Sequence, residues 1–491
     1  MDVQTSLLGL DTRLGSVVSQ ELIASEIPLP DGRDAASVLS AYARVFIEEA
    51  ECLNDTIRAS GRLELACACQ TMSGEAYGFT AQSTFTHTLS LEGVRPGMHA
   101  HVGAQVLECS AAPDALRLKL TAVLELSAFV SAPVTTPFIT GLSGARDVEK
   151  RLASLDVRRR VRLAEATLRL REEADANGVL RVLLYHGAAQ VTHLHFSGAS
   201  NCEAEGKVLI TTFVETESGE TQTMLITLPF TCSFDAQYAP TTWASCSIES
   251  LSVVAADVSF GVVDAEAVLR LSLFGIETTT CDVLLDAYDT SGSFSVKTEW
   301  IDRLCCSGAV QQAFSIQENV LIPQHLPDAM RAVYATAMPA VTGLFEADGM
   351  LGADVMLLTC VVYRCDEGRL HSFCEDIPVQ VRFDVPFSPD AQVDVRALSV
   401  LASGSGRALT VSYTLEGAAV LYATQPAALA TELAECAEPC PYSGILIYCA
   451  DAGETLWDVG KRFHVPLGTL SVWNPELCEP LAEGQAVVLM R

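Results

Sequence analysis

The sequence predicts a mainly β, multidomain protein in which three tandem sandwich-like domains precede a small strand–helix–helix–strand domain. Three observations support this fold class. A hairpin segment recurs three times, a run of alternating apolar and polar residues follows each copy, and the last fifty residues contain apolar residues at helical spacing. The predicted domains are residues 14–136, 156–290, 313–426 and 443–491, with a linker at residues 427–442.

The repeated segment is a β-hairpin whose turn carries a glycine. The turn glycines are Gly74, Gly219 and Gly368, separated by 145 and 149 residues (219 − 74 and 368 − 219). Eleven positions after them come the apolar residues Phe85, Phe230 and Val379. A period of this length is far above the roughly 20–50 residues of a solenoid repeat, so we expect each copy to be an autonomous domain with its own core. Short strands bounded by turns favour a β-sandwich for each copy.

Each hairpin is followed by a segment with the pattern of a strand. These segments are residues 116–129, 258–274 and 408–422. In the first of them, apolar and basic residues alternate from Leu116 to Leu120, which puts one face in a core and the other in water. Residues 137–160 and 291–312 are the expected linkers. Residues 427–442 are the expected tether to the last domain, made partly stiff by its prolines.

The last domain is expected to begin with an apolar strand at Ile445–Cys449 and to continue into a helix near residues 455–463. Thr455 and Asp458 have the spacing of a capping box, in which each satisfies a backbone N–H of the other. One apolar face of this helix consists of Leu456, Val459, Gly460 and Phe463. Gly460 is expected to let another part of the chain come close.

A second helix and a closing strand are expected after this one. Pro466 suits a helix start, where its missing N–H costs little. The helix should end at Asn474, because Pro475 disfavours a helical residue before it. The closing strand is expected at Ala486–Met490, after a turn that contains a glycine.

The charge balance restricts the possible partners. The chain has 31 Lys and Arg residues against 61 Asp and Glu residues, a formal net charge of −30. Nucleic acids and anionic membranes are therefore not expected as partners, since both demand basic surface. A basic protein surface would be attracted instead.

Targeting signals and cysteine usage point to a reducing compartment. The amino terminus has neither a basic segment nor a long apolar run, so no secretory signal is expected. The sequence contains no stretch of eighteen apolar residues, so no transmembrane segment is expected. The 17 cysteines are odd in number and irregularly spaced, which suits reduced thiols in a cytosol.

The motifs of several enzyme classes are absent from the sequence. There is no P-loop, no Gly-x-Ser-x-Gly nucleophile elbow and no His-Glu-x-x-His zinc motif. The pairs His99/His101 and His193/His195 could each share a strand face, but no third metal ligand is placed by the sequence. We therefore expect no catalytic residue, no metal and no cofactor. A hydrolase with a hidden pair of carboxylates remains an open alternative.

The last domain resembles the LysM domain. The residues that carry this resemblance are Gly453 to Trp457, Lys461 to Phe463, Trp473 to Pro475, and Gly484 with Gln485. The resemblance covers essentially all of residues 443–491 and implies a βααβ fold. It also implies that N-acetylglucosamine-containing glycans bind in a groove between the two strand–helix loops.

The motif positions imply a set of loop residues that bind a protein or a glycan. This set is Asp451, Gly453, Glu454, Thr455, Leu456, Asn474, Pro475 and Leu477. Asp451, Glu454 and Asp458 make the first loop acidic, which favours a basic protein patch over a neutral glycan. Replacing Asp451 or Glu454 is expected to weaken partner binding without unfolding the domain. The alternative is that Leu456 and Pro475, like Trp473, serve only as core and caps.

The whole arrangement resembles the SipL-type spore-coat morphogenetic proteins, whose repeated module is the SPOCS domain. The resemblance rests on three β domains followed by a LysM domain and on several short segments. These segments are Gly74-Glu75, Gly219-Glu220, Leu228-Pro229-Phe230, Ile377-Pro378-Val379 and Leu285-Asp286-Ala287-Tyr288. The first copy departs from the pattern, because Thr84 replaces the proline before Phe85.

The SipL resemblance implies a non-enzymatic adaptor or scaffold in endospore coat assembly. Such a protein lies in the mother-cell cytoplasm at the forespore surface. It links a coat morphogenetic ATPase layer, or other coat and forespore proteins, to that surface through its LysM and β domains. The alternative is a cell-wall protein whose LysM domain binds peptidoglycan through N-acetylglucosamine.

Overall fold

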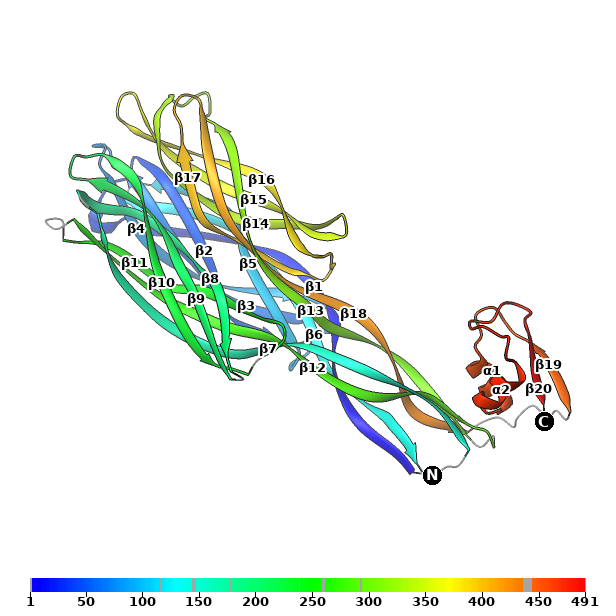
Figure 1. Ribbon diagram of the computed structural model, residues 1–491. Coiled ribbons are helices and arrows are strands. Elements are labelled where there is room, and N and C mark those ends of the chain that lie inside the picture. Colours follow the sequence, from blue (N-terminus) through cyan, green and yellow to red (C-terminus); the bar gives the residue numbers. More distant parts are fainter. Residues whose placement is uncertain are drawn as a thin grey trace.

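The protein is mainly β, as the sequence predicts. The computed structural model describes residues 2–114, 116–143, 147–176, 178–198, 200–237, 239–257, 261–291, 294–435 and 444–490. These residues form twenty strands, one 3-10 helix (Pro30–Gly32) and two α-helices (Figure 1). Neither α-helix of the described ranges has the length and apolarity needed to cross a membrane.

Three six-stranded units follow one another along the chain. The first unit comprises β1 (Asp2–Pro28), β2 (Ser37–Cys52), β3 (Thr56–Gln70), β4 (Ala76–Ser90), β5 (His99–Asp114) and β6 (Arg117–Ser143). The second comprises β7 (Val148–Asp175), β8 (Val179–Ser197), β9 (Asn201–Thr216), β10 (Thr221–Asp235), β11 (Thr242–Asp257) and β12 (Val262–Asp289). The third comprises β13 (Phe294–Leu321), β14 (Ala329–Ala347), β15 (Met350–Cys365), β16 (Leu370–Pro386), β17 (Gln392–Ser403) and β18 (Ala408–Glu435).

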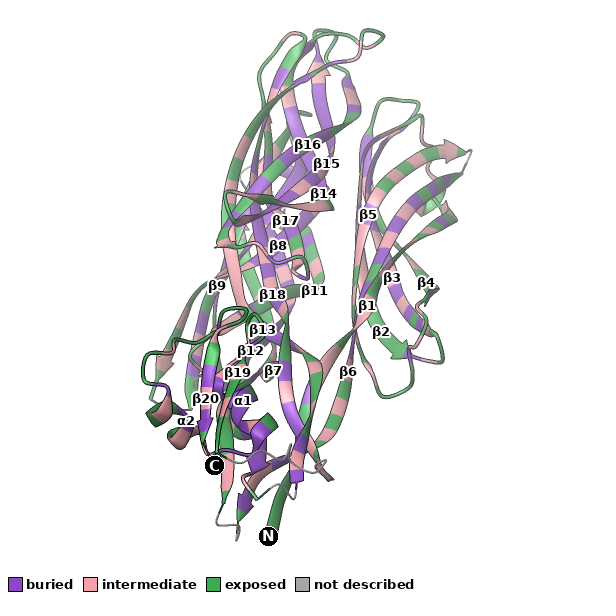
Figure 2. Cartoon of the chain, turned by 90° about the vertical axis from the view of Figure 1, so that its right-hand side faces the viewer, coloured by how far each residue is buried: buried purple, intermediate pink, exposed green. Residues whose placement is uncertain are grey.

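All three units have the same topology. The second, third and fourth strands form one antiparallel sheet, and the sixth strand pairs with the first and the fifth in another. Side chains from both sheets meet in a core, such as Leu63 of β3 and Leu120 of β6 in the first unit. Figure 2 shows the alternation of buried and exposed residues along the strands that the sequence pattern predicts. Each unit is therefore a sandwich with its own core.

The predicted hairpin turns are confirmed. Gly74, Gly219 and Gly368 have φ angles of +90°, +78° and +76°, in the left-handed region that favours glycine. They connect β3 to β4, β9 to β10 and β15 to β16. The apolar residues eleven positions later, Phe85, Phe230 and Val379, are all buried.

The second copy of the hairpin begins with a glycine because no larger residue fits at this position. Gly206 pairs directly with Phe230 across β9 and β10. A Cβ atom at Gly206 would lie 2.3 Å from the carbonyl oxygen of Gln190 and 2.4 Å from the Phe230 ring. The phenyl ring therefore covers the glycine, and any side chain at this position would displace it.

The three units do not stand apart; they pack around a common centre. Each second strand has a β-bulge at the same place in its register, at Leu39, Leu183 and Val333. These bulged residues are buried in a cluster that all three units share, which we call the axial cluster. Its other members are Ala68, Ala76, Leu184, Phe213, Tyr334, Val362 and Leu370. The expectation of autonomous domains is therefore only partly right, since each unit has its own core but also contributes to a shared one.

The contacts between units run in a closed ring. Thr223 of β10 donates a hydrogen bond of 2.6 Å to the carbonyl oxygen of Val333 in the third unit. Ser372 of β16 makes the corresponding bond of 3.3 Å to Val38 in the first unit. At the remaining seam, Gly78 of β4 lies against the carbonyl of Leu183, where a Cβ would come within 1.4 Å. All three residues are the fourth after their turn glycine, so the same position of the repeat contributes a contact to each of the three seams.

The first and sixth strands of each unit continue beyond its sandwich as a two-stranded arm (Figure 1). Residues 137–160 and 291–312, expected as linkers, lie mostly in these arms, in β6, β7 and β13. The linker expectation is wrong there because each segment pairs with a strand far away in the sequence. The same holds for residues 427–435, which belong to β18, while residues 436–442 lie outside the described residues. The boundaries 14–136, 156–290 and 313–426 stay predictions.

Apolar side chains from all three arms pack together. One such cluster contains Leu10 of the first unit, Val283 of the second and Leu429 of the third. A second cluster, nearer the arm ends, contains Leu142, Leu284 and Ala430. The arms are therefore held to one another by burial, which the sequence pattern alone did not indicate.

The carboxy-terminal unit has the predicted element order. Its elements are β19 (Ile445–Cys449), α1 (Leu456–Phe463), α2 (Leu467–Trp473) and β20 (Ala486–Met490). Thr455 and Asp458 form the predicted capping box at the start of α1. The predicted apolar face of α1 is buried, and α2 ends before Asn474 as expected. We call residues 444–490 the terminal module.

Candidate functional site

The predicted site residues lie on two neighbouring segments of the terminal module. Asp451, Gly453, Glu454 and Thr455 lie between β19 and α1, whose first residue is Leu456, and Asn474, Pro475 and Leu477 follow α2. The backbones of the two segments are joined, because Gly453 N–H donates to Leu481 O at 2.9 Å and Leu481 N–H donates to Glu454 O at 2.7 Å. The structure thus brings the two predicted loops together.

Three of the predicted residues mainly support the fold. The Leu456 side chain is buried in the module core. Asn474 is buried, where its side-chain oxygen accepts from Val488 N–H at 2.7 Å and its amide donates to Val488 O at 2.9 Å. Thr455 caps α1 through Asp458. Of the residues named in the alternative of core and caps, Leu456 is in the core and Trp473 packs against it, whereas Pro475 is exposed.

Glu454 holds three parts of the module together. Its Oε2 accepts hydrogen bonds from the Tyr448 hydroxyl and from Asp451 N–H, both at 2.9 Å. Its Oε1 lies 2.7 Å from an Arg462 guanidinium nitrogen, and its side chain is only 11% exposed. This carboxylate therefore fixes the first loop onto β19 and α1, which its sequence position did not reveal.

The remaining predicted residues form the surface that a partner can reach. Asp451, Gly453 and Pro475 are exposed, and Leu477 is half-buried against the core. We call these four residues the loop surface. Sequence reasoning missed Glu479, whose carboxylate accepts from Leu456 N–H at 2.5 Å and adds a further bond between the two loops.

Glu454 and Asp451 are therefore expected to behave differently when replaced. Glu454→Gln should lower the free energy of unfolding of the module by about 1–3 kcal/mol, because it weakens three partly buried interactions at once. Asp451→Asn should change it by less than about 0.5 kcal/mol, since its side chain is exposed. Urea unfolding followed by tryptophan fluorescence measures both. Equal stability of the two variants would contradict this assignment.

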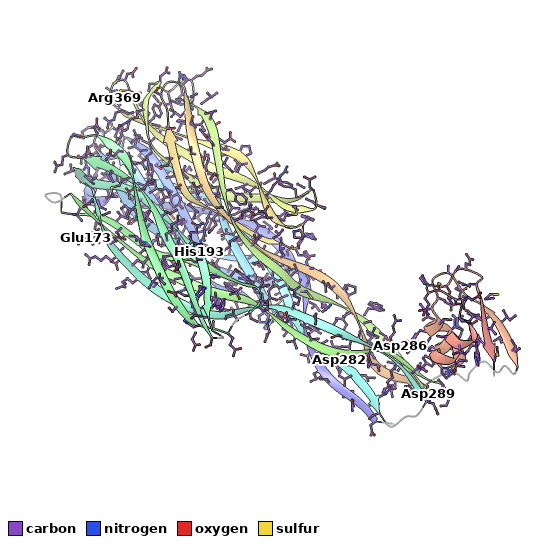
Figure 3. The ribbon with its side chains drawn as sticks, viewed as in Figure 1. Glu173, His193, Asp282, Asp286, Asp289 and Arg369 are labelled. Atoms are coloured by element: carbon purple, nitrogen blue, oxygen red, sulfur yellow. The ribbon has the colours of Figure 1, made fainter. Side chains whose placement is uncertain are left out.

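A second surface of α1 faces the arm of the second unit, and sequence reasoning did not predict it. Trp457 is buried, and its indole N–H donates to an Asp286 carboxylate oxygen at 2.8 Å. The Lys461 ammonium group lies 2.6 Å from the other oxygen of Asp286. Figure 3 shows Asp286 and Asp289 at the end of this arm, beside the terminal module.

Tyr288 completes this contact from the arm side. Its hydroxyl donates to the carbonyl oxygen of Val465 at 2.7 Å, and its ring meets Trp457 edge-on at 5.1 Å between centroids. Burial, aided by the charges of Glu149 and Asp286, raises the pKa of Tyr288 far above its usual value. The hydroxyl therefore stays protonated and acts as a donor at neutral pH.

No group of three or more His, Cys, Asp or Glu side chains is placed to hold a metal ion within the described ranges. His193 and His195 are exposed on β8. Every cysteine in the described part of the chain is free.

The comparisons with known proteins concern the first unit. Residues 34–113 match the family model described as SipL, SPOCS domain. In the structure this range runs from just before β2 through nearly all of β5. No curated protein and no solved structure matches the chain. The segment 34–113 is therefore similar to the SPOCS domain of the sporulation-related SipL family.

Proposed function

We propose that the protein is a non-enzymatic adaptor in endospore coat assembly. In this proposal the three six-stranded units are tandem SPOCS domains and the terminal module is a LysM domain. Together they link a coat morphogenetic ATPase layer, or other coat proteins, to the forespore surface from the mother-cell cytoplasm. The observation that carries the proposal is the SPOCS match at residues 34–113. The repeated topology and bulge positions of the other two units support extending it to them.

The charge of the module supports a basic protein partner. Both basic residues of α1, Lys461 and Arg462, are paired with carboxylates. Asp451 and Asp458 remain exposed around the first loop. The net charge of −30 extends this negative potential over the chain and would steer a basic partner to it.

The proposal is tested by locating the full chain in sporulating cells. A fluorescent fusion should form a ring around the forespore, and a pull-down from the same cells should recover coat proteins. Asp451→Lys should reduce this recovery severalfold, because it reverses a charge on the loop surface, while Asp282→Lys on the arm serves as a charge-matched control. Peptidoglycan sedimentation distinguishes the glycan-binding alternative. A fusion that marks the septum or wall, with sedimentation of the full chain, would replace the adaptor proposal by that alternative.

A further inference from the structure

The three arms are equivalent in geometry but differ in sequence at one end. The sixth strand of each unit has a bulge near its end, at Thr140, Leu285 and Thr431. Counting from these bulges, Asp286 corresponds to Gly141 in the first unit and Glu432 in the third. Likewise, Tyr288 corresponds to Ser143 and Ala434. Only the second arm therefore combines an acidic residue with an aromatic hydroxyl at these positions.

Asp286 is the polar centre of the contact with α1. Its two carboxylate oxygens receive different donors, the Trp457 indole at 2.8 Å and the Lys461 ammonium group at 2.6 Å. Trp457 and Lys461 lie four residues apart and so project from the same face of α1. The side chains of Asp286 and Lys461 are 20% and 31% exposed, which shields their attraction from solvent. Glycine at the equivalent position of the first arm could make neither contact.

Tyr288 supplies the apolar part of the contact and sets how closely α1 approaches the arm. It is fully buried, and a Cβ atom on Gly460 would lie 2.5 Å from its hydroxyl oxygen. The predicted close approach at Gly460 is thus made by the arm. His464, which ends α1 with a φ of +53°, adds a ring nitrogen 2.9 Å from the carbonyl oxygen of Asp289. Serine or alanine at the position of Tyr288 would leave this space unfilled.

We infer that the end of β12 is a dedicated docking surface for α1, and that Asp286 and Tyr288 determine which of the three arms holds the terminal module. The docked module keeps Asp451, Gly453 and Pro475 exposed, so the loop surface stays available to a partner. Three nearly equivalent arms thus carry one module in one defined place. This inference does not depend on what the module binds.

The test replaces the second arm's residues by those of the first in the full chain. The variant is Asp286→Gly with Tyr288→Ser, and its matched control is Glu432→Gly with Ala434→Ser on the third arm. Hydrogen exchange of the Trp457 indole N–H, followed by NMR on a chain labelled at tryptophan, should be at least about tenfold faster in the variant and unchanged in the control. Small-angle X-ray scattering should show a larger radius of gyration for the variant alone.

Amide protection in β19 and β20 shows whether the module itself remains folded. Should the double variant lose that protection, the milder pair Asp286→Asn and Tyr288→Phe removes the ion pair and one hydrogen bond while it preserves the packing. This pair should still accelerate indole exchange severalfold. Retained indole protection in the second-arm variants, or an equal loss in the third-arm control, would overturn the inference.

Discussion

Gly78→Ala is expected to lower the free energy of unfolding by about 3 kcal/mol or more. The added Cβ atom would lie 1.4 Å from the carbonyl oxygen of Leu183 and 2.4 Å from its carbonyl carbon. Both atoms belong to the backbone of the second unit, at its bulge, and cannot rotate away as a side chain could. The first two units must therefore separate, which exposes axial-cluster residues such as Leu39 and Leu183.

Urea unfolding measured by circular dichroism tests this expectation. Gly308→Ala is the control, because a Cβ on this strand glycine meets nothing closer than 3.9 Å. The control should change the free energy of unfolding by less than about 1 kcal/mol. Similar unfolding curves for the two variants would show that Gly78 is not in close contact with the backbone of Leu183. A separate early transition in Gly78→Ala would further indicate that the units lose their cooperativity.

The second large expected effect is a loss of folding stability at acidic pH, caused by the buried residue His186 on β8. Its Nδ1 lies 2.8 Å from the Tyr334 hydroxyl of the third unit, and its Nε2 is buried without a hydrogen-bond partner. Burial, with a smaller contribution from the charge of Arg44, lowers the pKa of His186 to about 4. The folded protein therefore holds this histidine neutral at pH values where the unfolded chain protonates it.

The sign of the pH dependence follows from linkage. Between pH 6.5 and pH 4 the unfolded state binds more protons at this site, so stability falls as the pH falls through this window. A pKa lowered from 6.5 to about 4 corresponds to about 3 kcal/mol of stability, present above pH 6.5 and lost by about pH 4.

The measurement compares unfolding free energies at pH 7 and pH 4.5 for the wild type and for two variants. His186→Asn keeps a polar atom near the Nδ1 position but cannot titrate, so the difference between the two pH values should shrink by about 2–3 kcal/mol. His193→Asn replaces an exposed histidine on the same strand and should leave the difference unchanged. An equally large difference in His186→Asn would assign the acid sensitivity to other groups.

Local signals were strongest in the terminal module. A capping box, a four-residue apolar face and two prolines predicted both helices within a residue or two, because each signal acts within one helical turn. The same signals could not distinguish a loop residue that can bind a partner from one that supports the fold of the module. Glu454 and Asp451 look alike in the sequence, yet one anchors three groups and the other faces solvent.

Local features were enough to predict the mainly β class, the hairpin turns at Gly74, Gly219 and Gly368, and the element order of the terminal module. These features depend on periodicity, on positive φ at glycine and on capping, all of which are local. Long-range packing, in contrast, closes the three units around the axial cluster and pairs their expected linkers into arms. It also brings α1 into contact with Asp286 and Tyr288. Those contacts join residues more than a hundred positions apart, and no local pattern specifies which distant surface a buried face will meet.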